Sequence, residues 1–250
     1  MRVIAGEAKG FKLKGPAGTF TRPMADKIKG ALFSMLESLG VAPSRVLDLY
    51  AGTGSIGIEA LSRGADWADF VDQHPAAVGV VRANITHTKF TAQSAVHQMA
   101  VLAFVMAGAS REPYDLVIMD PPYADPDIVP MLRRVGTSPL VQSGAVVAIG
   151  HSPRVSLPER AGRLVRLKER CHGDCCFSVY EAGDEADLAA DDAANQPGMS
   201  TDAAGNLPGE LRPDNAGPHG RGAASGRPVR RTDRGRLRRE EQAWRALLDY

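Results

Sequence analysis

The sequence is poor in cysteine and aromatic residues and has no long apolar run. Only three of its 250 residues are cysteine, and 6% are aromatic. No stretch of about 18 apolar residues occurs, as a membrane-spanning helix would need. The first residues also lack the apolar core and small-residue cleavage site of a secretory signal. These absences argue against a membrane role and predict a cytoplasmic protein.

The three cysteines, Cys171, Cys175 and Cys176, lie close together in the sequence. An odd number of clustered cysteines is a poor disulfide framework and suits a reducing compartment. Together with His172 they could form a metal site, but structural zinc sites usually use two separated ligand pairs, and the sequence offers no second pair. We therefore expect ordinary strand cysteines and no metal.

The chain has no overall excess of one charge sign, but its formal net charge of +1 hides an uneven distribution. Residues 184–210 hold seven acidic residues and no Lys or Arg, whereas residues 211–250 hold ten Arg and five acidic residues. Such polar sequence cannot bury a core. We expect a disordered tail over 184–250, acidic first and then rich in arginine, whose arginines either add binding to an anionic partner or belong to a plain extension.

The remaining 183 residues are mildly basic, with 20 Lys and Arg against 17 Asp and Glu. The excess lies in residues 1–30, where seven basic residues face only Glu7 and Asp26. A basic N-terminal segment can contact nucleic-acid phosphates, although it can also be an ordinary solvated surface. Charge alone leaves both interpretations open.

Residues 1–40 are predicted to be a basic hairpin followed by a helix, both part of the catalytic unit. Residues 2–14 have the pattern of two short strands around a glycine-rich turn. Apolar residues recur at helical spacing from Ile28 to Leu39, and Gly40 suits the end of that helix.

Residues 41–183 alternate between strand and helix patterns. Strands are predicted at 46–50, 68–71, 95–97, 114–119 and 145–149, with helices from Ser55, from Pro75, up to Ala107 and from Pro126. This alternation predicts an α/β fold with a doubly wound parallel sheet, and residues 163–168 and 176–180 should add an antiparallel hairpin. Ligands of such sheets bind beyond the carboxyl ends of the strands.

The first strand is followed by a glycine loop suited to an adenosine-containing ligand. Gly52, Gly54 and Gly57 form a G-x-G-x-x-G string, and Asp72 at the end of the next strand could accept hydrogen bonds from ribose hydroxyls. These features alone do not separate NAD from S-adenosylmethionine.

Asp48 favours S-adenosylmethionine. A carboxylate just before the glycine turn would repel the pyrophosphate of a dinucleotide, whereas S-adenosylmethionine carries a sulfonium, an ammonium and no phosphate. With Tyr50 and Ala51, the string resembles the cofactor motif of class I methyltransferases, a Rossmann-like fold.

The fourth strand is followed by Asp120, Pro121, Pro122 and Tyr123. This tetrapeptide resembles the motif of methyltransferases that act on planar amines in nucleic acids or glutamine. An amine conjugated to an aromatic ring is a weak nucleophile, and the Asp120 carboxylate and Pro121 carbonyl could hold its hydrogens while Tyr123 stacks on the base. A base bound in this way must lie outside its helical stack.

These motifs and the first 33 residues together resemble the bacterial RsmD family over residues 1–181. The shared strings include 1–6, 10–13, 21–23, 47–52, 59–65 and 120–123. The resemblance implies transfer of a methyl group to the N2 amine of a guanine in 16S ribosomal RNA during small-subunit assembly, on a seven-stranded sheet with an N-terminal hairpin.

The resemblance also implies roles for individual residues. It places the cofactor at Asp48, Gly52, Gly54 and Asp72, with catalysis at the Asp120 loop. It also implies that basic residues near the N-terminus contact RNA or close over the cofactor, namely Lys9, Lys12, Arg22 and Lys27.

Two departures from the family pattern stand out. The segment after the third strand lacks the usual polar or acidic residue for the adenine, so that Gln98 is the nearest candidate, and Met24 and Ala25 replace a small hydroxylated pair.

Three other functions remain open. An adenine-N6 methyltransferase would share the chemistry but normally carries a target-recognition domain, for which no segment is evident. An NAD-dependent oxidoreductase would use the glycine string but needs a substrate domain and gives the Asp120 loop no role. An RNA-binding assembly factor without activity would not need that loop.

Overall fold

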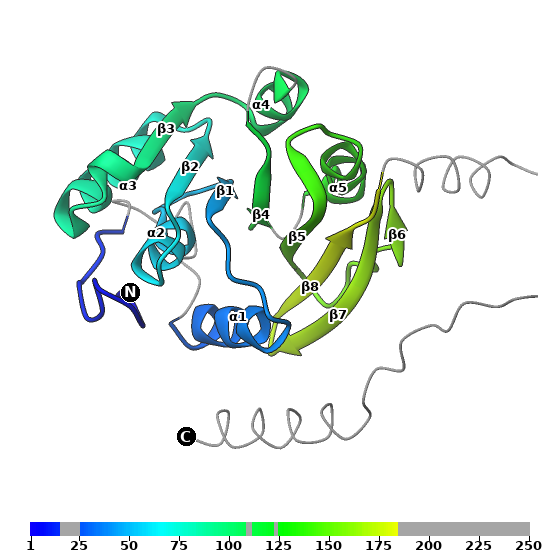
Figure 1. Ribbon diagram of the computed structural model, residues 1–250, viewed down its shortest axis with the longest axis horizontal. Coiled ribbons are helices and arrows are strands. Elements are labelled where there is room, and N and C mark those ends of the chain that lie inside the picture. Colours follow the sequence, from blue (N-terminus) through cyan, green and yellow to red (C-terminus); the bar gives the residue numbers. More distant parts are fainter. Residues whose placement is uncertain (16–25, 109–111, 123–124, 185–250) are drawn as a thin grey trace, which may run out of the picture. The chain divides into compact units, whose positions relative to one another are not determined.

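The computed structural model describes residues 1–15, 26–108, 112–122 and 125–184 (Figure 1). The chain divides into two units, residues 1–196 and 197–250, and the second lies outside the described residues. The predicted division at residue 183 into a catalytic unit and a tail therefore stays a prediction. No helix of the described residues is long and apolar enough to cross a membrane.

The first unit is built on one eight-stranded sheet with the strand order β3-β2-β1-β4-β5-β8-β7-β6. Neighbours from β3 to β5 are parallel, and the pairings of β5 with β8, β8 with β7 and β7 with β6 are antiparallel. The strands are β1 (Arg45–Leu49), β2 (Trp67–Asp72), β3 (Ser94–Gln98), β4 (Tyr114–Met119), β5 (Val141–His151), β6 (Arg160–Ala161), β7 (Leu164–His172) and β8 (Cys175–Ala182).

This topology confirms the predicted doubly wound sheet with its antiparallel hairpin at the C-terminal end. The implied count of seven strands is wrong by one, because β6 adds a short edge strand to β7. Two residues are too few to show the alternation of apolar and polar side chains by which a strand is recognised in sequence.

Helices cover both faces of the sheet (Figure 1). α4 and α5 lie on one face and α1, α2 and α3 on the other, so the central strands are buried on both sides. The helices are α1 (Asp26–Ser38), α2 (Ser55–Ser62), α3 (Pro75–Thr88), α4 (Val101–Met106) and α5 (Ile128–Gly136), with a 3₁₀ turn at Thr91–Gln93. α1 ends as predicted, since Gly40 has a φ of +76°.

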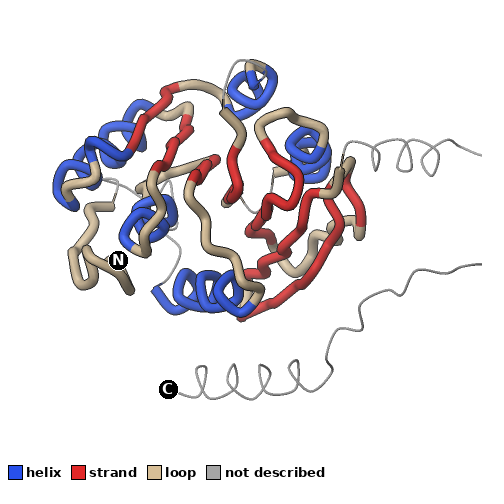
Figure 2. Tube along the Cα trace, viewed as in Figure 1, coloured by secondary structure: helices blue, strands red, loops and turns tan. Residues whose placement is uncertain are grey.

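The N-terminal arm, defined here as residues 1–15, is a loop with one antiparallel bridge between Arg2 and Lys12 (Figure 2). The prediction of two strands is therefore wrong, although the chain does reverse direction at the glycine-rich turn. The physical reason is that the arm satisfies part of its backbone against α2. The N–H groups of Ile4 and Ala5 donate to Glu59 at 2.8 and 3.0 Å.

The cysteine prediction is wrong for one pair, because Cys171 and Cys176 form a disulfide. The register of β7 and β8 places these two residues directly opposite each other, with their Cα atoms 3.9 Å apart. Sequence spacing alone does not reveal such a cross-strand pairing. Within the described ranges, no group of three or more His, Cys, Asp or Glu residues could hold a metal ion.

Candidate functional site

Three aspartates converge at the carboxyl ends of the central strands. Asp48 lies on β1, Asp72 ends β2, and Asp120 directly follows β4. Because β2, β1 and β4 are parallel neighbours, these positions meet at one edge of the sheet. The carboxylates of Asp72 and Asp120 both raise the pKa of Asp48 by charge repulsion, which places all three in one electrostatic site.

Asp48 is the most deeply buried member of the group, with 1% of its surface exposed. Its Oδ2 accepts a hydrogen bond from the Gly57 N–H at 2.9 Å, while Oδ1 has no hydrogen-bond partner among the described residues. Burial is the main cause that raises the pKa of Asp48 to about 8. An orphaned acceptor in a dry site is suited to a polar or cationic ligand.

The glycine loop between β1 and α2 has an unusual backbone. Gly52 and Gly54 have φ angles of +55° and +73°, and Tyr50 takes a φ of +60°, which is uncommon for a residue with a side chain. Such strain is found mainly where a ligand site requires it. Asp72 holds the loop in place, because its Oδ2 accepts the Gly52 N–H at 2.9 Å.

Asp72 is also tied to the segment after its own strand. Its Oδ1 accepts the His74 N–H at 2.9 Å, so each carboxylate oxygen already has one backbone donor. Carboxylate oxygens accept more than one hydrogen bond, so a ribose hydroxyl can still be accommodated. Ala51 is buried next to this acid and donates its N–H to the Val71 carbonyl at 3.0 Å.

Gly57, the third glycine of the string, is required by packing. A Cβ built at this position would lie 2.4 Å from Phe70 Cε1 and 3.1 Å from Asp48 Oδ2. The helix can therefore approach β2 and the Asp48 carboxylate only where no side chain intervenes.

Replacing Gly57 by alanine should destabilise the protein by about 1–3 kcal/mol, the usual cost of overpacking a core. Thermal unfolding of the variant measures this change. Gly79→Ala is the matched control, because Gly79 lies in α3 and a Cβ there meets no atom within 4 Å. Equal stability of the two variants would contradict the packing argument.

The Asp120 loop lies beside β1 and β5. The Asp120 N–H donates to the Leu49 carbonyl at 3.4 Å, and burial raises the pKa of the Asp120 carboxyl to about 6. Pro121 is buried and Pro122 is exposed, while Tyr123 lies outside the described residues. The half-buried Tyr50 belongs to the same surroundings, because burial and the charges of Asp125 and Asp127 raise its pKa to about 12.

The remaining predicted residues that the structure describes are more exposed than the three aspartates. Gln98 ends β3 opposite Asp72 in the register and is exposed, so its side chain is free to meet a ligand at this sheet edge. Lys9 and Lys12 are exposed on the N-terminal arm and Lys27 is exposed on α1. Arg22 lies outside the described residues.

The sequence analysis missed several residues close to the site. A Cβ at Gly150 in β5 would lie 2.6 Å from Asp120 Oδ1, so this strand directly borders the carboxylate. Lys29, Glu59 and Asn84 are buried polar residues on the helices around the glycine loop. Lys29 did carry a signal, since it precedes Leu32, Phe33 and Leu36 at the spacing of one helix face.

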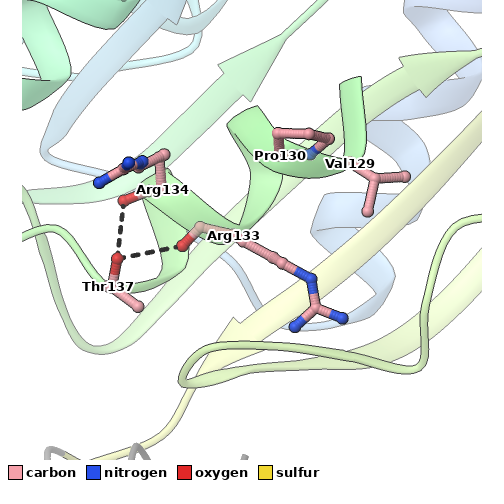
Figure 3. Close-up of a pocket in the computed structure, with 5 residues that line it drawn as sticks. All are labelled: Val129, Pro130, Arg133, Arg134 and Thr137. Atoms are coloured by element: carbon pink, nitrogen blue, oxygen red, sulfur yellow. Dashed lines mark hydrogen bonds between the residues drawn. The ribbon is translucent and has the colours of Figure 1, made fainter. Parts of the chain in front are cut away.

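One surface pocket lies on α5 and is lined by Val129, Pro130, Arg133, Arg134 and Thr137 (Figure 3). The Thr137 hydroxyl donates to the carbonyls of Arg133 and Arg134 at 3.2 and 3.3 Å. None of the predicted site residues that the structure describes lines this pocket. This hollow is therefore separate from the candidate site at the strand ends.

The chain is similar to proteins named as ribosomal RNA methyltransferases, and a family model matches most of it. The family model described as "Conserved hypothetical protein 95" matches residues 1–181. The putative rRNA methyltransferase YlbH of Bacillus subtilis is 34% identical over 182 residues, which are 72% of this chain and 98% of that protein. Ribosomal RNA small subunit methyltransferase D of Escherichia coli is 24% identical over 191 residues, 76% of this chain and 94% of that protein.

Solved structures share the fold. A hypothetical protein of Thermus thermophilus is 29% identical with a TM-score of 0.63, covering 73% of this chain and 99% of that one. A putative methyltransferase of Escherichia coli, yhhF, is 24% identical with a TM-score of 0.64, covering 73% and 98%. This second likeness supports the fold alone.

Proposed function

The chain belongs to the RsmD family, described as "Conserved hypothetical protein 95", and we propose that it transfers a methyl group from S-adenosylmethionine to the N2 amine of a guanine in 16S rRNA. Its substrate is the rRNA of a small-subunit assembly particle in the cytoplasm. The names of the relatives in Bacillus subtilis and Escherichia coli support rRNA as the substrate class. The observation that carries the proposal is the register of the neighbouring strands β1 and β4, which brings Asp48 and Asp120 to one edge of the sheet.

The residues around the glycine loop fit S-adenosylmethionine. The cofactor supplies a methyl group on a cationic sulfur. Asp48 offers an orphaned, buried acceptor to the positive part of the ligand, and the Gly52 and Gly54 backbone leaves room for close approach. Asp72 would hold the ribose, and Gln98 is the candidate for the adenine. Tyr50 and Ala51 shape the loop between these groups.

The Asp120 loop would prepare the amine. The Asp120 carboxylate and the Pro121 carbonyl would accept hydrogen bonds from the two amine N–H groups, which directs the nitrogen lone pair toward the methyl group. The carboxylate also stabilises positive charge that develops on the nitrogen. Pro122 restricts the loop, and Tyr123 would stack on the base. Lys9, Lys12, Arg22 and Lys27 would contact RNA phosphates.

An NAD-dependent oxidoreductase is disfavoured by the same geometry. The pyrophosphate of a dinucleotide would lie at the glycine turn that follows Asp48, where a phosphate is repelled by whichever of the buried Asp48 and Asp120 carboxyls is ionised. An adenine-N6 methyltransferase would use the same Asp120 chemistry and is therefore the second candidate. The two methyltransferase functions differ in the base that is labelled.

The purified full chain should be incubated with labelled S-adenosylmethionine and small-subunit particles that lack the modification. We expect label at a single guanine, identified by mass spectrometry of the digested rRNA. Labelling of adenine in DNA would favour the second candidate. Absence of label from both substrates would overturn the proposal.

Cofactor binding should depend on pH through Asp48. In the free protein its carboxyl has a pKa of about 8, so it is largely protonated at pH 7. The cationic cofactor pairs with the ionised form, so binding releases the Asp48 proton. The affinity for the cofactor should therefore rise with pH by up to roughly tenfold per pH unit, and it should level off above about pH 8. Calorimetric titration between pH 6 and pH 9 measures this.

Asp48→Asn is the control for this titration, because the amide does not ionise. The variant should bind more weakly at pH 9 and should keep only the pH dependence that belongs to the ligand itself. An unchanged pH profile in Asp48→Asn would show that Asp48 does not face the cofactor.

A further inference from the structure

Two buried side chains connect the N-terminal arm to the glycine loop and to the start of α2. The Asn84 amide donates to the Lys14 carbonyl of the arm at 3.0 Å and to the Thr53 carbonyl of the loop at 2.9 Å. The Lys29 ammonium donates to the Arg2 carbonyl of the arm at 2.8 Å and to the Ser55 carbonyl at 3.3 Å. Asn84 therefore bridges the arm to the glycine loop, and Lys29 bridges the arm to the first residue of α2, which directly follows that loop.

Both bridging residues have an exposed fraction of 0%. Asn84 Oδ1 also accepts the Lys14 N–H at 2.8 Å, so Asn84 binds both backbone polar groups of that residue. Lys29 pairs with Glu59 at 3.1 Å, and its burial lowers the pKa of the ammonium despite this partner. Buried polar groups are costly unless they are fully bonded, so these bridges hold strongly preferred positions.

The rest of the arm is held against α2. Ser62 donates its hydroxyl to the Ala5 carbonyl at 2.6 Å and accepts the Ala8 N–H at 3.0 Å. Gly6 packs so closely that a Cβ there would lie 1.6 Å from the Ser62 carbonyl oxygen. Because α2 begins at Ser55, directly after the glycine loop, the arm, the loop and this helix are joined by buried contacts.

The arm carries exposed lysines, whereas the loop lies at the proposed cofactor site. We propose that Lys29 and Asn84 are positioning residues that couple binding of RNA by the arm to binding of the cofactor by the glycine loop. This inference rests on the proposed function. A ligand that orders the arm orders the loop through the two bridges, and the coupling must act equally in both directions.

The coupling is measured as a ratio of affinities. The full chain is titrated with S-adenosylhomocysteine, a non-reactive stand-in for the cofactor, in the absence and presence of small-subunit particles that lack the modification. The reverse titration measures particle affinity with and without S-adenosylhomocysteine. We expect both titrations of the unaltered protein to give the same enhancement, on the order of tenfold.

Two variants remove one bridge each. Asn84→Asp keeps an acceptor for the Lys14 N–H but loses the amide donor, and Lys29→Met keeps the chain length but loses the ammonium. In each variant we expect the ratio of the affinities measured with and without the second ligand to fall to about two or less, because the arm and the loop then become ordered independently. Lys29→Arg retains a cationic donor and should keep most of the coupling.

Ser178→Ala is the matched control, because Ser178 is equally buried and its hydroxyl bonds His151 and Glu169 on strands away from the arm. It should keep the full enhancement. Amide hydrogen exchange of the free protein gives a second readout: Asn84→Asp should speed exchange in both residues 1–15 and 52–57. If Lys29→Met does not fold, the hydrogen exchange of Asn84→Asp still tests the coupling between the arm and the loop.

The two proposals fail in different ways. If the unaltered protein labels a guanine but shows no enhancement, or if Asn84→Asp keeps it, the coupling is refuted and the function stands. If the unaltered protein neither labels rRNA nor binds the particles, the proposed function itself is refuted.

Discussion

Replacing Asp120 by alanine should lower kcat by roughly 10²- to 10⁴-fold, the range found when a group acting on the transition state is removed. The dissociation constant of S-adenosylhomocysteine should change by no more than about twofold, because Asp120 would face the amine and not the cofactor's binding groups. Single-turnover kinetics and calorimetry on the same preparation separate the two quantities. Lost cofactor binding with normal turnover per bound cofactor would reverse this assignment.

The binding comparison should be made at pH 9. The Asp120 charge contributes to the raised pKa of Asp48, so alanine at 120 changes the ionisation of Asp48 at neutral pH. Above the pKa of Asp48 both proteins carry the carboxylate and can be compared directly. Asp120→Asn serves as the conservative variant: its amide oxygen still accepts one hydrogen bond, so it should retain more activity than alanine.

The pH profile provides an independent test of the Asp120 role. Burial raises the pKa of this carboxyl to about 6, and only the ionised form carries the negative charge that stabilises positive charge developing on the amine nitrogen. Activity should therefore rise as pH increases through about 6, and this limb should be absent from the residual activity of Asp120→Asn. A limb that persists in the variant would belong to another group.

The sequence predicted the parts of the site that are determined locally. Gly52, Gly54 and Asp120 lie in short strings between a strand and a helix, where positive φ angles and close backbone approach leave a recognisable pattern. The parallel sheet followed from the alternation of strand and helix, and strand order then brings Asp48, Asp72 and Asp120 to one edge.

Contacts that depend on strand register or on tertiary packing were not predictable in the same way. The pairing of Cys171 with Cys176 depends on the register of β7 and β8, and the arm is irregular because Glu59, more than fifty residues away, accepts its N–H groups. Gly150 looks like an ordinary strand residue until β5 is placed beside β4. Such features depend on tertiary packing, which a local pattern does not contain.

Glu59 offers the largest expected effect on stability. This fully buried carboxylate pairs with Lys29 at 3.1 Å and accepts the backbone N–H groups of Ile4 and Ala5, and Arg63 donates to it at 2.9 Å. Replacing it by leucine leaves the Lys29 ammonium buried without its carboxylate. Removing one partner of a buried ion pair costs about 3–5 kcal/mol.

A loss of that size should lower the melting temperature by roughly 6 to 20 °C for a domain of this length. The double variant Lys29→Met/Glu59→Leu provides the decisive comparison, because it removes both charges together. It should melt at a higher temperature than Glu59→Leu alone, since a buried pair replaced by apolar residues leaves no uncompensated ion. Part of the loss should remain, because the N–H groups of Ile4 and Ala5 still lack their acceptor. If the double variant is no more stable than the single one, the main stabilising role of Glu59 is to anchor the arm and not to neutralise Lys29.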